Sequence, residues 1–139
     1  MTTSKLPICP YCGGDSAKTT GQFVYPHVKR LNARTFYFCD DGHPPAWVGS
    51  HKRTGRPLGT LANAELRAER TNTHQLFDPL WQAEGRAARE GLYLWLGDAM
   101  GLRPNKCHIG MFDLDQCREA QQVIMAELGR KIAAAEGAA

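Results

Sequence analysis

The sequence feature that most constrains this chain is a pair of cysteines, Cys9 and Cys12, spaced C-x-x-C and followed by two glycines. Such a turn points backbone N–H groups at the sulfur atoms and lets both thiolates reach one tetrahedral ion. A redox pair would be expected at the start of a helix in a βαβ unit, and no helical pattern follows the glycines. Unliganded cysteines are the other alternative. The turn is interpreted as half of a structural zinc site.

The remaining ligands of this site are expected to come from a second turn, which a β-hairpin places next to the first. The intervening chain contains two strand-like runs, residues 22–25 and 34–38, which are rich in aromatic and β-branched residues. Cys39 follows the second run directly and is the third predicted ligand. After Pro44 and Pro45, residues 46–51 are predicted to return to the sheet as a further strand.

The fourth ligand follows from the spacing C-x-x-x-H after Cys39, which makes His43 the preferred residue. His51 and His27 stay open as substitutes, because either could reach the site through the fold. The sequence therefore predicts Zn²⁺ as the cofactor of a Cys3His site. The predicted metal ligands are Cys9, Cys12, Cys39 and His43.

Composition indicates an ordinary globular protein. The chain has 139 residues, of which 42% are hydrophobic, and five cysteines. No apolar run approaches the length of a membrane span, and the first residues lack the apolar core of a secretory signal. We therefore expect a cytoplasmic protein with no membrane partner, whose cysteines are metal ligands and free thiols instead of disulfides.

Positive charge is concentrated in the N-terminal part of the chain. Residues 1–59 contain eight Lys/Arg and three Asp/Glu, whereas residues 60–139 contain nine and eleven. Basic residues flank the predicted hairpin and follow its last strand, where they could contact phosphates of DNA or RNA. A solvated surface is the alternative. The candidate nucleic-acid-binding residues are Lys29, Arg30, Arg34, Lys52, Arg53 and Arg56.

Aromatic residues are interleaved with these basic residues. They could stack on nucleic-acid bases, or they could form the small core of the zinc-binding part. Alternation along Phe36, Tyr37 and Phe38 places at least one ring on each face of a strand. The aromatic set is Phe23, Tyr25, Phe36, Tyr37 and Trp47.

Beyond the turn-rich residues 52–59 the pattern becomes helical. A first helix is predicted from Thr60, as its cap, with an end or a kink at Pro79. A second is predicted from about Arg86 to Met100, stopped by Gly101. A capping box at residues 113–116 predicts the start of a third. The predicted class is α+β: a zinc ribbon of short antiparallel strands over residues 1–59, and a bundle of about three helices over residues 60–139.

Several polar constellations lie outside the ribbon. His51, Asn63 and His74 follow the order of residues in ββα-metal nucleases, but Asn63 and His74 would lie about 16 Å apart on one helix. His74 and Asp78 form an i, i+4 pair, which is either an oriented histidine or a helix-surface hydrogen bond. Glutamates alternate with arginines along these helices and indicate a solvated surface. Those arginines are Arg67, Arg70, Arg86 and Arg89.

The cysteines of the C-terminal half allow two interpretations. Cys107 and His108 lie in a loop and could join Cys117 in a second metal site, although no fourth ligand is evident. Cys117 also fits the buried stripe of the third predicted helix as a small apolar residue.

Several motifs together resemble a known family. They are Cys9-Pro10-Tyr11-Cys12, residues 48–52, 57–62 and 65–67, residues 74–81 (HQLFDPLW) and residues 107–113 (CHIGMFD). This combination, over roughly residues 8 to 125, resembles a family of zinc-finger-containing proteins of unknown function from phages and prophages. The resemblance implies a zinc site and supplies no activity. The family pattern would place a cysteine close after Cys39, where Gly42 and His43 stand here.

The sequence favours a non-catalytic role. Glycine-rich phosphate loops of the forms GxxxxGK[ST] and GxGxxG are absent, and no nucleophile stands in a recognisable catalytic motif. We expect a nucleic-acid-binding module with a structural zinc. The alternatives are a metal-dependent nuclease that uses His51, and an adaptor that binds a host or phage protein.

Overall fold

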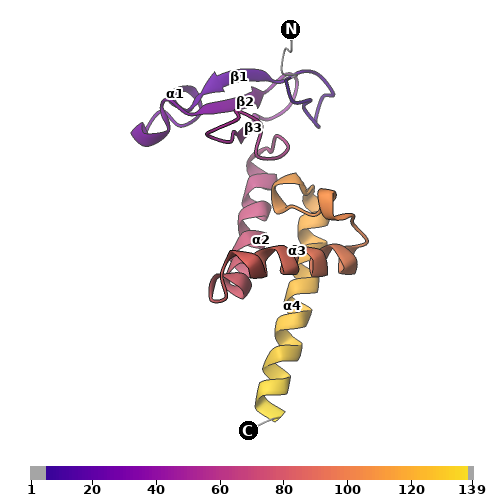
Figure 1. Cartoon of the computed structure of the whole chain (residues 1–139). Coiled ribbons are helices and arrows are strands. Elements are labelled where there is room, and N and C mark those ends of the chain that lie inside the picture. Colours follow the sequence, from indigo (N-terminus) through magenta and orange to yellow (C-terminus); the bar gives the residue numbers. More distant parts are fainter. Residues whose placement is uncertain (1–5, 138–139) are drawn as a thin grey trace. The chain divides into compact units, whose positions relative to one another are not determined.

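The computed structural model describes residues 6–137 and contains a three-stranded antiparallel sheet followed by three long helices (Figure 1). The predicted α+β class is confirmed. The chain forms two compact units, the first ending at Arg67 and the second beginning at Ala68. No helix within the described range is long and apolar enough to cross a membrane.

The sheet of the first unit has the order β1-β2-β3. Its middle strand β2 contributes the residue pairs that define both faces: Phe38 lies opposite Ala17 on β1 and Trp47 on β3, and Cys39 lies opposite Ala46. The strands are β1 (Ala17–Thr20), β2 (Thr35–Cys39) and β3 (Ala46–Gly49).

The prediction of a strand over residues 22–25 is wrong, because residues 22–24 belong to the one-turn helix α1 (Gly21–Val24). Gly21 donates its N–H to the carbonyl of Arg34 at 2.9 Å, and the chain then curls back toward Leu31. A Cβ atom on Gly21 would lie 1.7 Å from the Leu31 carbonyl oxygen. This close approach is a tertiary contact that the strand propensity of the segment does not reveal.

The two faces of the sheet have different surroundings, because successive side chains of a strand alternate between them. One face, the core face, packs Tyr37, Cys39 and Ala46 into a buried cluster with Cys9 and Leu61. The opposite face carries the neighbouring residues of the same strands. We call it the aromatic face, defined by Phe36, Phe38 and Trp47 of the sheet with Phe23 and Tyr25 from the segment after β1.

A turn of basic composition extends the sheet after β3. Ser50 and Pro57 form a β-bridge, and the His51 N–H donates to the Arg56 carbonyl at 2.8 Å. The hydroxyl of Tyr37 donates to the carbonyl of Gly55 from the core face. We call residues 50–57 the basic hairpin.

Helix α2 (Ala64–Gln82) begins three residues later than predicted, because its cap is Asn63 instead of Thr60, and it continues past Pro79 to Gln82. The side-chain oxygen of Asn63 accepts the N–H of Leu66 at 3.0 Å, and its carbonyl accepts the N–H of Arg67 at 2.9 Å. Upstream, Ala62 is still paired with Trp47 of β3, which keeps the preceding chain extended.

The other two long helices begin where predicted, and the first of them also ends where predicted. Helix α3 (Arg86–Met100) ends at Gly101, which adopts the left-handed conformation with φ of 71°. Helix α4 (Leu114–Gly137) follows the predicted capping box. The backbone N–H of Gln116 donates to the Asp113 carboxylate at 2.8 Å, and the side-chain oxygen of Gln116 accepts the backbone N–H of Asp113 at 3.0 Å.

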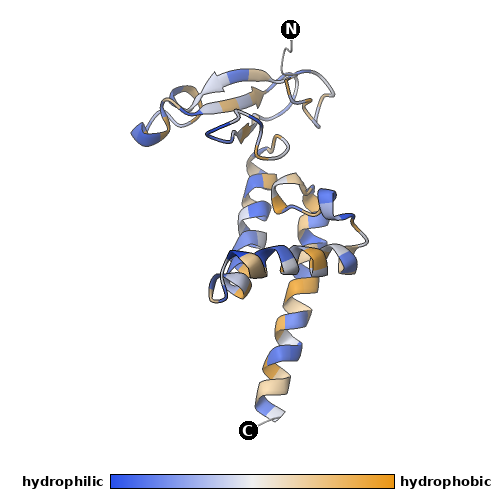
Figure 2. Cartoon of the chain, viewed as in Figure 1, coloured by the Kyte–Doolittle hydropathy of each residue, from blue (hydrophilic) through white to orange (hydrophobic). Residues whose placement is uncertain are grey.

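The second unit has its own core, built on apolar stripes of its helices. Hydrophobic and hydrophilic residues alternate along α4 in Figure 2, as expected of a helix with one buried side. The rings of Phe77 and Tyr93 lie 4.4 Å apart between centroids. Fully buried members of this core are Phe77, Leu96, Ile109, Phe112, Cys117 and Ile124.

Two arginines depart from the expected solvated helix surface. Arg70 is buried and donates from Nε to the carbonyl of Phe112 at 3.0 Å. The guanidinium of Arg67 lies over the ring of Trp47, 3.4 Å from its centroid, and donates to the Ala62 carbonyl at 2.8 Å. The contacts with Phe112 and Trp47 join residues that are distant in sequence, so charge alternation along one helix could not predict them.

Candidate metal centre

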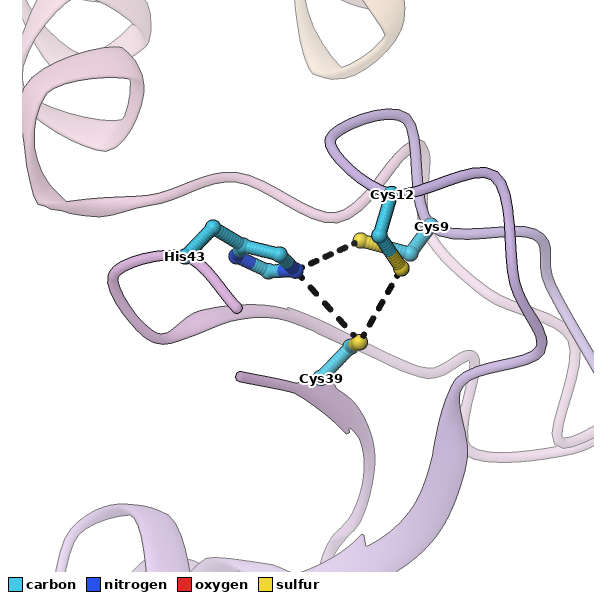
Figure 3. Close-up of side chains that lie close together, drawn as sticks. All are labelled: Cys9, Cys12, Cys39 and His43. Atoms are coloured by element: carbon cyan, nitrogen blue, oxygen red, sulfur yellow. Dashed lines mark hydrogen bonds between the residues drawn. The ribbon is translucent and has the colours of Figure 1, made fainter. Parts of the chain in front are cut away.

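The four predicted ligands converge at one end of the sheet. Cys9 and Cys12 come from the first turn, Cys39 ends β2, and His43 lies in the turn between β2 and β3 (Figure 3). Their ligand atoms all lie within 4.8 Å of one another. The cluster therefore joins residues up to 34 positions apart through the pairing of β2 with β3 and the packing of Cys9 on the core face.

Three distances within the cluster lie close to the edges of a zinc tetrahedron. With Zn–S of about 2.3 Å and Zn–N of about 2.0 Å, tetrahedral angles give S···S edges of about 3.8 Å and S···N edges of about 3.5 Å. The sulfurs of Cys12 and Cys39 are 3.7 Å apart. Nε2 of His43 lies 3.3 Å from the sulfur of Cys9 and 3.5 Å from that of Cys39. The donor set and its spacing thus fit one Zn²⁺ ion.

His43 is oriented for ligation by its own backbone neighbour. Its Nδ1 lies 2.7 Å from the carbonyl oxygen of Pro44, so Nδ1–H is the donor and Nε2 is left with a free lone pair facing the sulfurs. The ring also packs against Tyr11, with centroids 5.3 Å apart. This support from Pro44 and Tyr11 could not be found from sequence spacing.

The first turn has the geometry of a metal-binding knuckle. Cys9 accepts the N–H of Gly13 on its carbonyl and donates its own N–H to the carbonyl of Gly14, each at 2.8 Å. Gly13 has φ of 76°, which favours glycine, and the Gly14 N–H points at the Cys12 sulfur at 3.4 Å. The two glycines after the C-x-x-C pair therefore close the turn and help neutralise a thiolate.

The electrostatics of the cluster favour one thiolate and oppose several. Burial alone would raise the pKa of Cys9, but hydrogen bonds from the backbone N–H groups of Tyr11 and Cys12 and from neighbouring thiols lower it below its ordinary value. The Asp41 N–H lowers the pKa of Cys39, whereas burial and the adjacent Cys12 and Cys9 raise it by more, to about 11. Three thiolates this close need a divalent cation to offset their repulsion.

The imidazole of His43 also responds to these neighbours. The carbonyl of Pro44 is the largest cause that raises its pKa, followed on the raising side by Cys12 and Asp40, while burial opposes the shift. A bound cation would instead lower the pKa of His43, because Nε2 must be unprotonated to bind a metal ion.

The structure does not bring the alternative ligands His27 and His51 to the metal centre, and the second metal site considered around Cys117 is not present in the described residues. Within residues 6–137, only these four residues bring three or more ligand groups close enough to share an ion. His27 and His51 are exposed and belong to other loops. Cys107 and Cys117 are fully buried, and burial raises the pKa of each thiol, so they behave as small apolar core residues.

The remaining polar constellations have local roles. Nδ1 of His74 lies 3.5 Å from the Asp78 carboxylate, which also accepts the indole N–H of Trp81 at 3.0 Å. Asn63 uses its side-chain oxygen to cap α2. The predicted i, i+4 pair is therefore present, and the Asp78 carboxylate is shared with Trp81.

The candidate nucleic-acid-binding residues occupy two loops and one strand end of the first unit. Lys29 and Arg30 lie on the 3-10 helix η1 (Lys29–Leu31), and Arg34 donates to the Ser50 carbonyl at 3.1 Å. The basic hairpin supplies the other three. Its exposed side chains surround an open hollow of about 420 Å³, lined by His51, Lys52, Arg53, Thr54 and Arg56.

These features define a class: a small zinc-finger protein in which a Cys3His centre closes one end of a three-stranded sheet. Comparison with protein families agrees with this class. The chain matches the zinc-finger-containing domain family over residues 5–127 and belongs to it. No curated protein and no solved structure matched the chain.

Proposed function

We propose that this protein binds one Zn²⁺ ion through Cys9, Cys12, Cys39 and His43, and that the zinc-stabilised unit binds nucleic acid through its basic residues. The proposal of zinc rests on the convergence of four ligand atoms, all within 4.8 Å of one another, and on membership of a zinc-finger-containing family. In such a small unit the ion contributes directly to folding, because the unfolded chain has no preformed site.

The observation that carries the nucleic-acid proposal is the distribution of charge in the first unit. No Asp or Glu occurs between Ser16 and Cys39, or between Gly42 and Ala64. These two stretches build the sheet, η1 and the basic hairpin, and they contain seven Lys/Arg residues. The acidic residues of residues 1–64 are confined to positions 15, 40 and 41. A surface of one sign attracts polyanions and releases their counterions on contact.

Within this unit the basic hairpin is the best placed contact for phosphates. Its Lys52, Arg53 and Arg56 side chains are exposed and converge on one hollow. The Tyr37 hydroxyl donates a hydrogen bond to the Gly55 carbonyl of the hairpin, and a backbone hydrogen bond joins His51 to Arg56. The basic side chains therefore project from a turn of fixed conformation. Arg34 has a structural contact with Ser50, and we assign it a supporting role.

The test is binding of the zinc-loaded full chain to labelled nucleic acids, measured by fluorescence anisotropy between 50 and 200 mM salt. The variant Lys52→Gln/Arg53→Gln/Arg56→Gln should weaken binding and reduce the slope of log K against log salt by about two to three. The matched control, Arg86→Gln/Arg103→Gln/Arg130→Gln, removes the same charge from the second unit and should leave the slope unchanged.

Other outcomes would overturn the proposal. Equal effects of the two triple variants would mean that net charge, and not the hairpin, drives binding. Mg²⁺-dependent cleavage that disappears in His51→Ala would favour the nuclease alternative. No interaction with any nucleic acid would favour a protein partner. Metal analysis that finds no zinc in the purified chain would refute the metal assignment.

A further inference from the structure

The aromatic face of the sheet is partly open, in contrast to the core face. The core face is covered by the zinc-binding turn and Leu61. On the aromatic face, Phe36 is buried, whereas Phe38, Trp47 and Tyr25 are half-buried and Phe23 is 61% exposed. A small unit gains stability by covering large rings, so rings that remain accessible on a sheet indicate a binding surface.

The rings form one connected array on this face. Phe38 and Trp47 are register partners on adjacent strands, with planes 20° apart and centroids separated by 6.3 Å. Phe23 meets Phe38 edge-on at 5.1 Å. On β1, the register partner of Phe38 is Ala17, whose single methyl group covers little of the ring. The sheet therefore fixes the rings of Phe38 and Trp47, and the contact with Phe38 places the ring of Phe23 beside them.

Hydrogen bonding and charge fix Trp47 within this array. Its indole N–H donates to the hydroxyl of Tyr25 at 2.9 Å, and the guanidinium of Arg67 lies 3.4 Å from its ring centroid. A guanidinium stacked on an aromatic ring can contact a phosphate or stack on a base while keeping its charge. The face thus combines ring surfaces with a cation.

The chemistry of this face selects one type of partner. Apolar rings alone would suit a protein, but the Arg67 guanidinium lies on Trp47 itself. The two stretches that build the sheet, η1 and the basic hairpin also carry seven Lys/Arg residues and no acidic residue. Flat rings beside positive charge suit single-stranded nucleic acid, because its unpaired bases can stack on the rings while its phosphates contact the cations. Bases in a duplex are already stacked on each other and cannot offer their faces.

We propose that the aromatic face is a stacking platform for unpaired bases, so that the ligand is single-stranded nucleic acid. This inference rests on the proposed nucleic-acid-binding function and names its ligand class. Phe23 and Phe38 supply the accessible ring surfaces. Trp47 packs beside Phe38 and is itself fixed by its contacts with Tyr25 and Arg67.

The test compares the zinc-loaded wild-type chain with Phe23→Ala and Phe23→Tyr, using a labelled 15-nucleotide oligo-dT, oligo-U and a 15-base-pair duplex. Loss of a stacking ring should weaken single-strand binding about 5- to 150-fold in Phe23→Ala, and Phe23→Tyr should restore it. The salt slope should not change, because no charge is removed. The oligo-dT and oligo-U arms distinguish DNA from RNA as the source of the strand.

Ile8→Ala is the matched control, because Ile8 is an apolar residue of the same unit with a similar exposure of 57%. It should bind like the wild-type chain. Salt-sensitive binding that is equal for duplex and single strand, or unaffected by Phe23→Ala, would refute the platform and leave the proposed function intact. Absence of all binding would refute the proposed function itself. Phe38→Leu, checked for unchanged zinc content, provides a second and independent ring deletion.

Discussion

The hydroxyl of Tyr11, in the turn between Cys9 and Cys12, accepts the backbone N–H of Asn63 at 3.1 Å. Asn63 is also the cap of α2, so the first turn of the metal centre and the start of the helix share one hydrogen bond. The ring of Tyr11 packs against His43 as well. A single side chain therefore contacts a predicted ligand and the helix start.

Removing this hydroxyl should lower stability modestly. In Tyr11→Phe the ring contact with His43 remains, while the Asn63 N–H loses its protein acceptor and turns to water. We expect a loss of about 0.5–1 kcal/mol in the free energy of unfolding, measured by urea denaturation of the zinc-loaded protein. A denaturation midpoint equal to wild type would show that water replaces the hydroxyl without cost.

Loss of a cysteine ligand should have a much larger effect. Cys12→Ala leaves three ligands for the ion, and metal binding in such units is coupled to folding. We expect loss of bound zinc and of the amide chemical-shift dispersion of the first unit, measured by metal analysis and NMR. Cys117→Ala is the control: it deletes a buried thiol outside the cluster and should retain one zinc per chain even if its stability falls.

Exchange of the histidine ligand tests the geometry more sharply than its removal. His43→Cys replaces nitrogen by sulfur, with an increase in bond length of about 0.2–0.3 Å, and tetrahedral zinc accepts either donor. We expect His43→Cys to keep the metal and His43→Ala to bind it more weakly, measured by competition with a chromogenic chelator. Equal affinities of His43→Ala and wild type would remove His43 from the ligand set.

The metal cluster could be predicted because its signals are local. Cys9 and Cys12 are three residues apart with glycines behind them, and Cys39 with His43 repeats a turn-sized spacing. The sheet brings the Cys9–Cys12 turn together with Cys39 and His43, and the strands of this sheet could be predicted only in part. Residues 22–24 have strand propensity but belong to helix α1, where the backbone of Gly21 packs closely against the Leu31 carbonyl.

The helices illustrate the same division between local and distant causes. The capping box at Asp113 and the left-handed Gly101 act within a few residues, and both were predictable. The start of α2 was missed because pairing of Ala62 with Trp47 extends the chain past Thr60. Burial of Arg70 depends on the Phe112 carbonyl, 42 residues away, which no helical pattern encodes.

The close approach at Gly21 gives the last prediction. A Cβ atom there would meet the Leu31 carbonyl oxygen at 1.7 Å and its carbon at 2.5 Å, and these are backbone atoms that cannot rotate away. Gly21→Ala should therefore force α1 and η1 apart and cost at least about 2–3 kcal/mol of folding stability. Gly91→Ala is the matched control, because Gly91 lies inside α3 and, apart from its chain neighbours and the backbone of its own helix, no atom lies within 4 Å of its Cβ position.

The control should change stability in the opposite direction. Alanine has the higher helix propensity, so Gly91→Ala should stabilise the protein by about 0.5–1 kcal/mol. Thermal denaturation of both variants, each with its zinc content verified, measures the contrast. If Gly21→Ala were as stable as wild type, the backbone of Gly21 could not pack against the Leu31 carbonyl, and an extended strand over residues 22–25 would describe this segment better. Opposite signs for two chemically identical substitutions would locate the constraint in the packing of Gly21 and not in glycine itself.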